Sequence, residues 1–462
     1  MEKFRWFIDK SGIEFKQHQY DGVEWVLCNE TREDILCHGG IIADEMGLGK
    51  TITMIGVLIS NFKLRTLIVL PSVLIQQWVY EIGRTTGHKP LVFYGADKKI
   101  ITLDQLNEAP IVVTSYATIA IKDATDLNNA SLLHQVKWNR VVFDEAHHLR
   151  NKNSRYWGAK VLVSPIKWLI SGTPIQNKRR DFLNLCSIIG LPSSYCAEGS
   201  KMDELLRNHV LRRTKANAGI SLPELQLGCK NVSWKTESER VLSEDIHNAI
   251  HYATAMDRLR LYVQARQTCI LPAMLKDKMA GLMENGFIPR EHNHNHVIAL
   301  NCSSKIDAVI NTLLSRCGNG NGKLVFCHFR QEIDTIISRL REKGLQNVAS
   351  FDGRNRTRNK TLQACHEILV LQIQTGCEGL NLQADYCEVY FVSPNWNPAV
   401  EEQAIARCHR IGQIKPVHVF RFHMRTFQLP EDAEETVIIP SLDKYIHLVQ
   451  DEKREISNAI LP

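Results

Sequence analysis

Short apolar runs alternate with segments of helical periodicity twice along this chain of 462 residues, once in residues 36–175 and again in residues 303–425. A continuous apolar run of about four to eight residues, bounded by turn residues, is typical of a strand that is buried on both faces. Such strands occur in parallel sheets that are covered by helices on each side. The sequence therefore predicts the α/β fold class, with two parallel-sheet lobes.

The expected strands of the first lobe are Gly40–Ala43, Thr66–Leu70, Pro90–Phe93, Ile111–Thr114, Arg140–Asp144 and Lys167–Ser171. Those of the second lobe are Lys323–Cys327, Val348–Phe351, Ile368–Ile373, Tyr386–Val392 and Val417–Phe422. Helices are expected at Lys50–Asn61, Val73–Ile82, Glu332–Lys343 and Ala399–Cys408.

A different pattern fills the segment between the two lobes. Charged helical patterns in Thr236–Ala265 precede the polar tract EHNHNH, Glu291–His296. These histidines could bind a transition metal, but a disordered polar loop is the expected structure. A helical pattern also occupies Glu431–Asn458. The predicted domains are therefore a lobe in residues 1–215, a helical insert in 216–300, a second lobe in 301–425 and a helical tail in 426–462.

Composition narrows the class of protein but does not identify a partner. The net charge of +6 permits a polyanion without demonstrating one. The 13 cysteines include no Cys-x-x-Cys pair, which argues against a disulfide framework and a structural zinc site and favours the cytosol or the nucleus. No apolar run approaches the ~18 residues of a membrane span, and the first residues lack the apolar core of a signal peptide. We expect no membrane partner.

The stretch GGIIADEMGLGKTITMIG, Gly39–Gly56, places a strand, a glycine-rich turn and a helix in succession. Glycines let the backbone approach a ligand, and the amides that begin the helix point at phosphate oxygens. Lys50 is placed to reach the β- and γ-phosphates of ATP, and the Thr51 hydroxyl to coordinate Mg²⁺. Asp44 stands where the strict pattern has Gly or Ala, so this is a GxGKT variant; a glycine turn with a surface lysine is the alternative. The predicted nucleotide-binding residues here are Asp44, Glu45, Met46, Gly47, Leu48, Gly49, Lys50 and Thr51.

The stretch RVVFDEAHHL places Asp144 and Glu145 at the carboxyl end of an expected strand, where parallel sheets bind ligands. Adjacent carboxylates are costly there unless a cation or a proton is present. We expect Asp144 to hold Mg²⁺, directly or through water, and Glu145 to polarise the attacking water. The alternative is a strand-end pair that faces solvent. Either His147 or His148 is expected to relay between this site and the next motif.

The stretch EEQAIARCHRIGQ, Glu401–Gln413, carries Arg407 and Arg410 three residues apart, so both share one helical face if the helix continues. An arginine from a second surface can accelerate phosphoryl transfer by about 10³–10⁵. Taken alone, this motif does not decide between catalytic arginines and a solvated basic helix end. Its companion motifs favour the catalytic role, so both arginines are predicted catalytic residues, with Glu145 and Lys50.

These motifs, in this order, resemble those of the SNF2-type branch of the superfamily 2 helicase-like ATPases. The matching segments are HQYDGVEWV (His18–Val26), DEMGLGKT (Asp44–Thr51), LIVLPSVLIQQW (Leu67–Trp78), VVTSY (Val112–Tyr116), DEAH (Asp144–His147), SGTPIQN (Ser171–Asn177), LRRTK (Leu211–Lys215), SSKI (Ser303–Ile306), GCEGLNLQ (Gly376–Gln383), NWNP (Asn395–Pro398) and RCHRIGQ (Arg407–Gln413). The short chain without recognisable appended modules is similar to small viral members, such as the baculovirus global transactivators.

The resemblance implies two RecA-like lobes with ATP and Mg²⁺ at their seam. Gln19 would read the adenine, and Arg407 and Arg410 would act as arginine fingers from the second lobe. The implied partner is double-stranded DNA, along which the protein would translocate without strand separation to remodel protein–DNA complexes in transcription. The implied location is the nucleus, or the host nucleus for a viral protein.

The DNA contacts that the resemblance and the basic run RNRTRNK suggest are mostly to phosphates. The predicted residues are Ser72, Thr114, Ser115, Tyr116, Lys152, Arg354, Arg356, Arg358 and Asn381. For the basic run, a solvated loop is an equally open alternative.

The second lobe departs from the family pattern in two places. The segment between Gly353 and Gly376 is short, and Cys377 and Glu378 stand where the family has glycine and an apolar residue. Glu378 adds negative charge near the expected path of DNA. These departures leave a rival function open, a DNA-binding regulator whose ATPase is weak or lost. A strand-separating helicase is a third alternative, which the HRIGQ ending disfavours.

Overall fold

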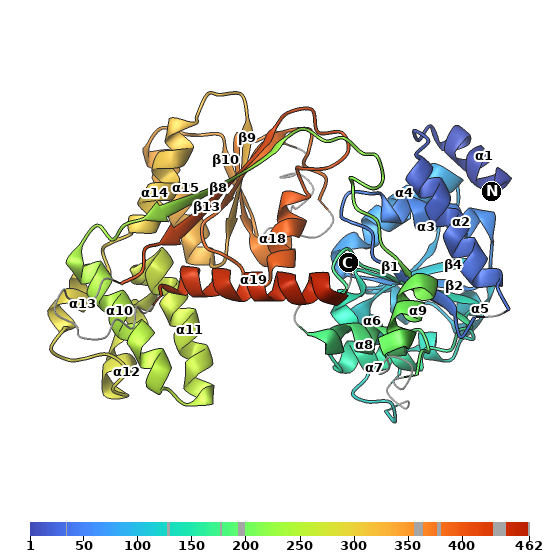
Figure 1. Ribbon diagram of the computed structural model, residues 1–462, viewed down its shortest axis with the longest axis horizontal. Helices are drawn as coiled ribbons and strands as arrows, with labels where there is room; N and C mark the ends of the chain where they lie inside the picture. The colour runs from blue at the N-terminus through green and yellow to red at the C-terminus, as the bar shows by residue number, and fades with distance from the viewer. Residues whose placement is uncertain are drawn as a thin grey trace. The chain divides into compact units, whose positions relative to one another are not determined.

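The structure is a computed structural model, and it describes residues 1–33, 35–126, 130–175, 178–192, 199–354, 364–376, 380–427 and 440–460. The chain forms two compact units (Figure 1). Unit 1 comprises Met1–Ser221 with Glu455–Pro462, and unit 2 comprises Leu222–Arg454.

Unit 1 is built on a parallel sheet in the order β3-β4-β2-β5-β6-β1-β7. Its strands are β1 (His38–Ile42), β2 (Thr66–Leu70), β3 (Leu91–Phe93), β4 (Ile111–Ser115), β5 (Arg140–Asp144), β6 (Ile166–Ile170) and β7 (Val210–Leu211). Its helices are α1 (Glu2–Ser11), α2 (Gln17–Thr31), α3 (Lys50–Ser60), α4 (Ile75–Thr86), α5 (Leu103–Glu108), α6 (Tyr116–Ile119), α7 (Ser154–Val161), α8 (Arg179–Ile188) and α9 (Gly199–His209).

Both faces of this sheet are buried, as the continuous apolar runs predict. Alternate residues along each strand enter two separate hydrophobic clusters; Ile68 of β2 packs with the helices α1 to α4, whereas Leu67 and Val69 pack in the cluster that includes α7 and α8. Because a parallel strand buries side chains on both sides, it contains no polar alternation.

Unit 2 is built on a second parallel sheet, in the order β10-β11-β9-β12-β13-β8. Its strands are β8 (Leu225–Val232), β9 (Gly322–Cys327), β10 (Val348–Phe351), β11 (Ile368–Gln372), β12 (Tyr386–Phe391) and β13 (Val417–Met424). Its helices are α10 (Glu237–Tyr252), α11 (Ala255–Ile270), α12 (Met279–Glu284), α13 (Asn293–Ala299), α14 (Ser304–Ser315), α15 (Arg330–Glu342), α17 (Ile373–Gly376), α18 (Pro398–Ile405) and α19 (Leu442–Ile460), which continues into unit 1 after Arg454.

The α/β fold class with two parallel-sheet lobes is confirmed. The expected strands are all present within two residues at each end. Two strands were missing from the prediction, β7 and β8. The sequence of β8, LQLGCKNV, has no apolar run, and most of its side chains are exposed at the edge of the sheet. Its strand conformation comes from parallel pairing with β13 over all eight residues.

The segment between the lobes packs within unit 2. Helices α10 and α11 share one hydrophobic cluster with β9, α14 and α15. The helical pattern of Thr236–Ala265 is broken at Thr254, whose hydroxyl accepts a hydrogen bond from the Asp257 amide and starts α11. The tract EHNHNH is not the expected loop, because its last four residues begin α13. The four domain boundaries stay predictions.

One stretch, Asn293–Ser315, is long and apolar enough by composition to cross a membrane. Here it forms α13 and α14, half of the window is buried inside the protein, and Lys305 within it is completely buried. We interpret it as core structure, since α14 supplies Ile306, Val309 and Leu313 to the unit 2 cluster.

The described part of the expected tail is helix α19, which is anchored by polar contacts. Asp443 forms a buried ion pair with Lys305 of the SSKI segment and accepts a hydrogen bond from the Met424 amide (2.8 Å). The Leu442 amide donates to His247 Nε2 (2.9 Å), and burial lowers the pKa of His247 to about 4, so this ring stays neutral and can accept.

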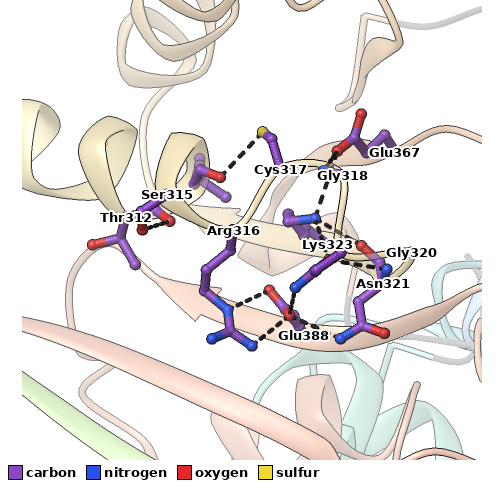
Figure 2. A network of polar contacts seen from close by, with 12 residues as sticks. Thr312, Ser315, Arg316, Cys317, Gly318, Gly320, Asn321, Lys323, Glu367 and Glu388 are labelled. Carbon is purple, nitrogen blue, oxygen red and sulfur yellow. Dashed lines mark hydrogen bonds and ion pairs between the residues drawn. The ribbon is translucent and has the colours of Figure 1, made fainter.

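Near the amino ends of β9 and β12 in unit 2, the buried carboxylate of Glu388 accepts several hydrogen bonds (Figure 2). Glu388 accepts hydrogen bonds from Arg316 (2.7 Å), Asn319 (2.8 Å) and Asn321 (3.1 Å) through Oε1, and from the Tyr390 hydroxyl (2.6 Å) through Oε2. Burial alone would raise the pKa of Glu388, but these donors outweigh it and lower the pKa to about 2. The carboxylate is therefore a charged structural centre.

Candidate functional site

The glycine-rich loop after β1 has the backbone that the GxGKT pattern requires. Gly47 and Gly49 have φ of 93° and 79°, a region that side chains with a Cβ disfavour. A Cβ on Gly49 would also lie 2.3 Å from Gln19 Nε2. Helix α3 starts at Lys50 directly after Gly49. The loop therefore presents the first amides of α3 in the arrangement that binds phosphate.

The loop is covered by the start of α2. His18 Nε2 and Gln19 Nε2 both contact the Leu48 carbonyl, at 2.9 and 3.3 Å. Burial lowers the pKa of His18, so its ring is neutral and donates this hydrogen bond. Gln19 Oε1 is buried and has no hydrogen-bond partner among the described residues. A buried acceptor without a donor is costly, and the exocyclic amino group of adenine would satisfy it.

Asp44 and Glu45 hold the loop to the end of the LRRTK segment. Arg213 makes a bidentate ion pair with Asp44, with Nε 3.0 Å from Oδ1 and NH2 against Oδ2. Lys215 pairs with Glu45 Oε1 (3.0 Å). These contacts explain the carboxylate at the position where the strict pattern has Gly or Ala. Arg213 and Lys215 were missing from the predicted site residues; LRRTK marked them only as part of a resemblance.

The Lys50 ammonium lies over the loop. Its Nζ donates to the carbonyls of Asp44 (2.8 Å) and Glu45 (3.3 Å). An ammonium has three donors, and phosphate oxygens would compete with these carbonyls for them. The remaining predicted residues of the loop, Met46 and Thr51, are half-buried, and Thr51 is in the first turn of α3.

Asp144 ends β5 and is held by three neighbours. Trp78 Nε1 donates to Oδ2 (2.7 Å), the Glu145 amide to Oδ1 (2.9 Å), and the Tyr116 hydroxyl to the Asp144 carbonyl (2.6 Å). Burial, and then the charge of Glu145, raise the pKa of Asp144 to about 7, while Lys50 opposes this. A buried carboxylate beside a half-buried one favours a bound cation. The oxygen donors of Asp144 and Thr51 are of the type that Mg²⁺ prefers.

Glu145, the second acidic residue of the motif, has an unusual backbone conformation. Its φ of 49° is left-handed, which is uncommon for a residue with a side chain and is often found at functional sites. Its Oε2 lies 3.3 Å from His147 Nδ1, and the same nitrogen lies 3.5 Å from the Ser171 hydroxyl. His147 therefore touches both the acidic motif and the SGTPIQN segment, whereas His148 stacks on His147 and contacts Arg155.

In unit 2, Arg407 and Arg410 lie after α18, because that helix ends at Ile405 and the expected helical continuation is wrong. Arg407 Nε donates to the Gln403 carbonyl (3.1 Å), and Arg410 NH1 donates to Asn381 Oδ1. Among the described residues neither guanidinium has a carboxylate partner. Burial, and then the charge of Arg407, lower the pKa of Arg410 to about 10. Two neighbouring cations, Arg407 buried and Arg410 half-buried, without a carboxylate partner among the described residues favour an anionic ligand.

Three of the predicted DNA contacts have side chains that point into unit 1, and their contact with DNA stays a prediction. Thr114 is fully buried and donates to the Phe93 carbonyl (2.8 Å). Ser115 is bonded within its own turn, and the Tyr116 hydroxyl is bonded to Asp144. These side chains shape the end of β4 and support the acidic motif, because their polar atoms are already satisfied inside.

The other predicted DNA contacts differ in accessibility. Ser72 and Lys152 are exposed. Arg354 is paired with Asp352 and with Asp334 (2.7 Å), so a phosphate would have to displace carboxylates. Asn381 is bonded to Arg410. The remaining two, Arg356 and Arg358, lie outside the described residues.

Two family models match this chain, one within unit 1 and one within unit 2. The model of the SNF2-related domain matches residues 18–198, and that of the helicase conserved C-terminal domain matches residues 304–412. The chain belongs to the SNF2-type family of helicase-like ATPases.

Two curated relatives and one solved structure illustrate the similarity. The SNF2-type chain is 28% identical over 478 residues to the ATP-dependent DNA helicase DDM1 of Arabidopsis thaliana, which covers 89% of this chain and 59% of the plant protein. It is 26% identical over 483 residues to the probable global transactivator of Orgyia pseudotsugata multicapsid polyhedrosis virus, which covers 96% of this chain and 91% of the viral protein. The Sulfolobus solfataricus SWI2/SNF2 ATPase core in complex with dsDNA has a TM-score of 0.41 and 22% identity, covering 97% of this chain and 93% of that one.

The SNF2-type chain thus spans less than two thirds of the plant helicase but most of the viral protein.

Proposed function

We propose that this protein is a DNA-stimulated ATPase that translocates on double-stranded DNA and remodels protein–DNA complexes, with a role in transcription. The grouping in unit 1 carries the proposal. It comprises the Gln19 oxygen, which has no partner among the described residues, the glycine loop with Lys50, and Asp144 with its raised pKa beside Glu145. Gln19 suits the base of Mg-ATP, the glycine loop with Lys50 suits the phosphates, and Asp144 suits the metal. The implied location is the nucleus, or the host nucleus for a viral protein.

The proposed division of work follows from the chemistry of each group. Gln19 selects the base, and Lys50 and the amides of α3 neutralise phosphate charge. Asp144 and Thr51 would hold Mg²⁺, which would supply positive charge to offset that of the phosphates. Glu145 orients the attacking water. From unit 2, Arg407 and Arg410 would stabilise the charge that spreads over the transferred phosphoryl group. Closing the two units on ATP would then couple hydrolysis to movement along DNA.

The test is phosphate release by the full chain with duplex DNA, single-stranded DNA or RNA as stimulants. Wild-type protein should respond most strongly to duplex DNA, and Lys50→Ala should lose turnover by about 10² or more, because a preorganised cation at the phosphates is removed. The exposed Lys99→Ala is the matched control and should behave as wild type. Normal turnover by Lys50→Ala would defeat the site assignment.

The same assay separates the rivals. Slow turnover that duplex DNA does not stimulate would favour a DNA-binding regulator. Strand separation of a forked duplex would favour a helicase, and we expect none.

A further inference from the structure

We propose that Asp245, His292 and His296 form a binding site for a divalent transition metal of the Zn²⁺ class, separate from the nucleotide residues. Asp245 is in the middle of α10, His292 is the residue before α13, and His296 is in α13. Their ligand atoms all lie within 4.8 Å of one another.

The two histidine rings converge on the Asp245 carboxylate. His292 Nδ1 lies 2.8 Å and His296 Nε2 lies 2.7 Å from the same oxygen, Asp245 Oδ2. The two histidines are four residues apart, so they project from one side of the start of α13. At metal–ligand distances of about 2.0–2.2 Å, tetrahedral ligand atoms lie about 3.3–3.6 Å apart, so each nitrogen would have to move about 0.5–0.8 Å away from the Asp245 oxygen. Two imidazoles and a carboxylate leave one tetrahedral position for water, a set that suits Zn²⁺.

The burial pattern also fits a metal better than a plain salt bridge. The side chain of His296 is fully buried, that of Asp245 is 10% exposed and that of His292 is 40% exposed, so the cluster opens to solvent on one side. In the described part of the chain no lysine or arginine pairs with Asp245. A nearly buried carboxylate without a permanent cation is costly, and a dication removes that cost.

The surroundings hold the ligands in place. Ser238 of α10 donates to Asn295 of α13 (3.1 Å), and Glu239 accepts hydrogen bonds from the amide and hydroxyl of Ser304. Asp245 and His292 are 47 residues apart, and the segment between them includes α11 and α12. A bound metal would therefore cross-link the two ends of this helical segment and stabilise its folded state by mass action.

The test uses the full chain after removal of metals with a chelator, titrated with Zn²⁺ alone and with Co²⁺ alone. Wild type should bind one Zn²⁺ per chain and gain thermal stability. His292→Ala should lose affinity by more than the ~10–100-fold that loss of an outer partner costs, because a direct ligand is removed. His294→Ala, an exposed histidine between the two ligands, is the matched control and should bind as wild type.

Two further readouts keep the result decisive. Co²⁺ bound by nitrogen and oxygen should lack the thiolate charge-transfer absorption that cysteine ligands produce, and its appearance would overturn the assignment. Asp245→Asn should lose binding as His292→Ala does. If Asp245→Asn fails to fold, the result for His292→Ala decides, because His292 is half-exposed and its replacement can be checked for an intact fold by circular dichroism. Stoichiometric binding that survives His292→Ala, or no stoichiometric binding by wild type, would refute the site.

Discussion

At the residue scale, Asp144 and Glu145 carry the same carboxyl group and are adjacent in sequence, yet their surroundings differ. Asp144 accepts hydrogen bonds from Trp78 and from the Glu145 amide, which hold it still. Glu145 has left-handed backbone and contacts His147 at 3.3 Å. A held carboxylate suits a metal, whereas a carboxylate beside an ionisable ring suits proton handling. The two roles that we propose rest on this difference in surroundings and not on the chemical group, which is the same in both residues.

We predict that Glu145→Gln retains ATP binding and lowers hydrolysis by about 10²–10⁴, the usual contribution of a positioned general base. Glutamine keeps the size of the side chain but cannot take a proton. Filter binding of ATP beside phosphate release measures the two effects separately. Collapse of ATP affinity with normal residual turnover would give Glu145 another role.

The arginines of unit 2 give a second prediction at this scale. Arg410→Ala should slow hydrolysis by about 10³ or more while ATP binding stays nearly intact, because an arginine finger acts on transition-state charge. Arg407→Ala should behave in the same way. The exposed Arg260→Ala, also in unit 2, is the control. Unchanged turnover in Arg410→Ala would mean that this pair of cations serves only the structure of unit 2.

At the scale of elements, the short strand β7 determines how the glycine loop is supported. β7 pairs with β1, and the residues after it bring Arg213 to Asp44 across 169 positions of sequence. Asp44 is 1% exposed, and its carboxylate is paired with this guanidinium. The glycine loop is therefore supported by a segment that itself carries no phosphate-binding pattern.

We predict that Arg213→Ala lowers the free energy of unfolding of unit 1 by about 3–5 kcal/mol, because a buried carboxylate loses its partner. Asp44→Asn should relieve most of that cost in the double variant, since the unpaired charge is then gone. Denaturant unfolding of the wild type, the two single variants and the double variant measures this double-mutant cycle. Additive effects of the two substitutions would show that the ion pair does not carry the coupling.

At the scale of the whole molecule, the acid stability of unit 2 should depend on Glu388 (Figure 2). Folding lowers the pKa of Glu388 from 4.5 to about 2. A lowered folded-state pKa stabilises the fold fully above pH 4.5, and this contribution is lost as the pH falls from 4.5 toward 2.

Glu388→Gln should therefore destabilise unit 2 by about 3 kcal/mol or more at neutral pH, because Arg316 loses its carboxylate. The difference from wild type should shrink as the pH falls below 4.5. Chemical denaturation from pH 7 to pH 3, followed at the transition of unit 2, measures it. A difference that does not change with pH would mean that lost packing, and not lost charge, causes the effect.

The sequence by itself determined the features that depend on near neighbours. The buried strands follow from continuous apolar runs, and the glycine loop follows from a backbone that only glycine adopts easily, as at Gly49. The family also follows from the ordered motifs, and the domain models agree with it.

Only the tertiary structure decided the features that join distant segments. The strand β8 exists because β13 offers it an edge, and the helix at EHNHNH exists because α10 packs against it. Thr114 and Tyr116 turn inward because Phe93 and Asp144 supply acceptors there. The meeting of Asp245 with His292 across 47 residues is likewise invisible to local periodicity. Patterns within one turn or one strand report local backbone preference, whereas these contacts arise only after the whole chain has packed.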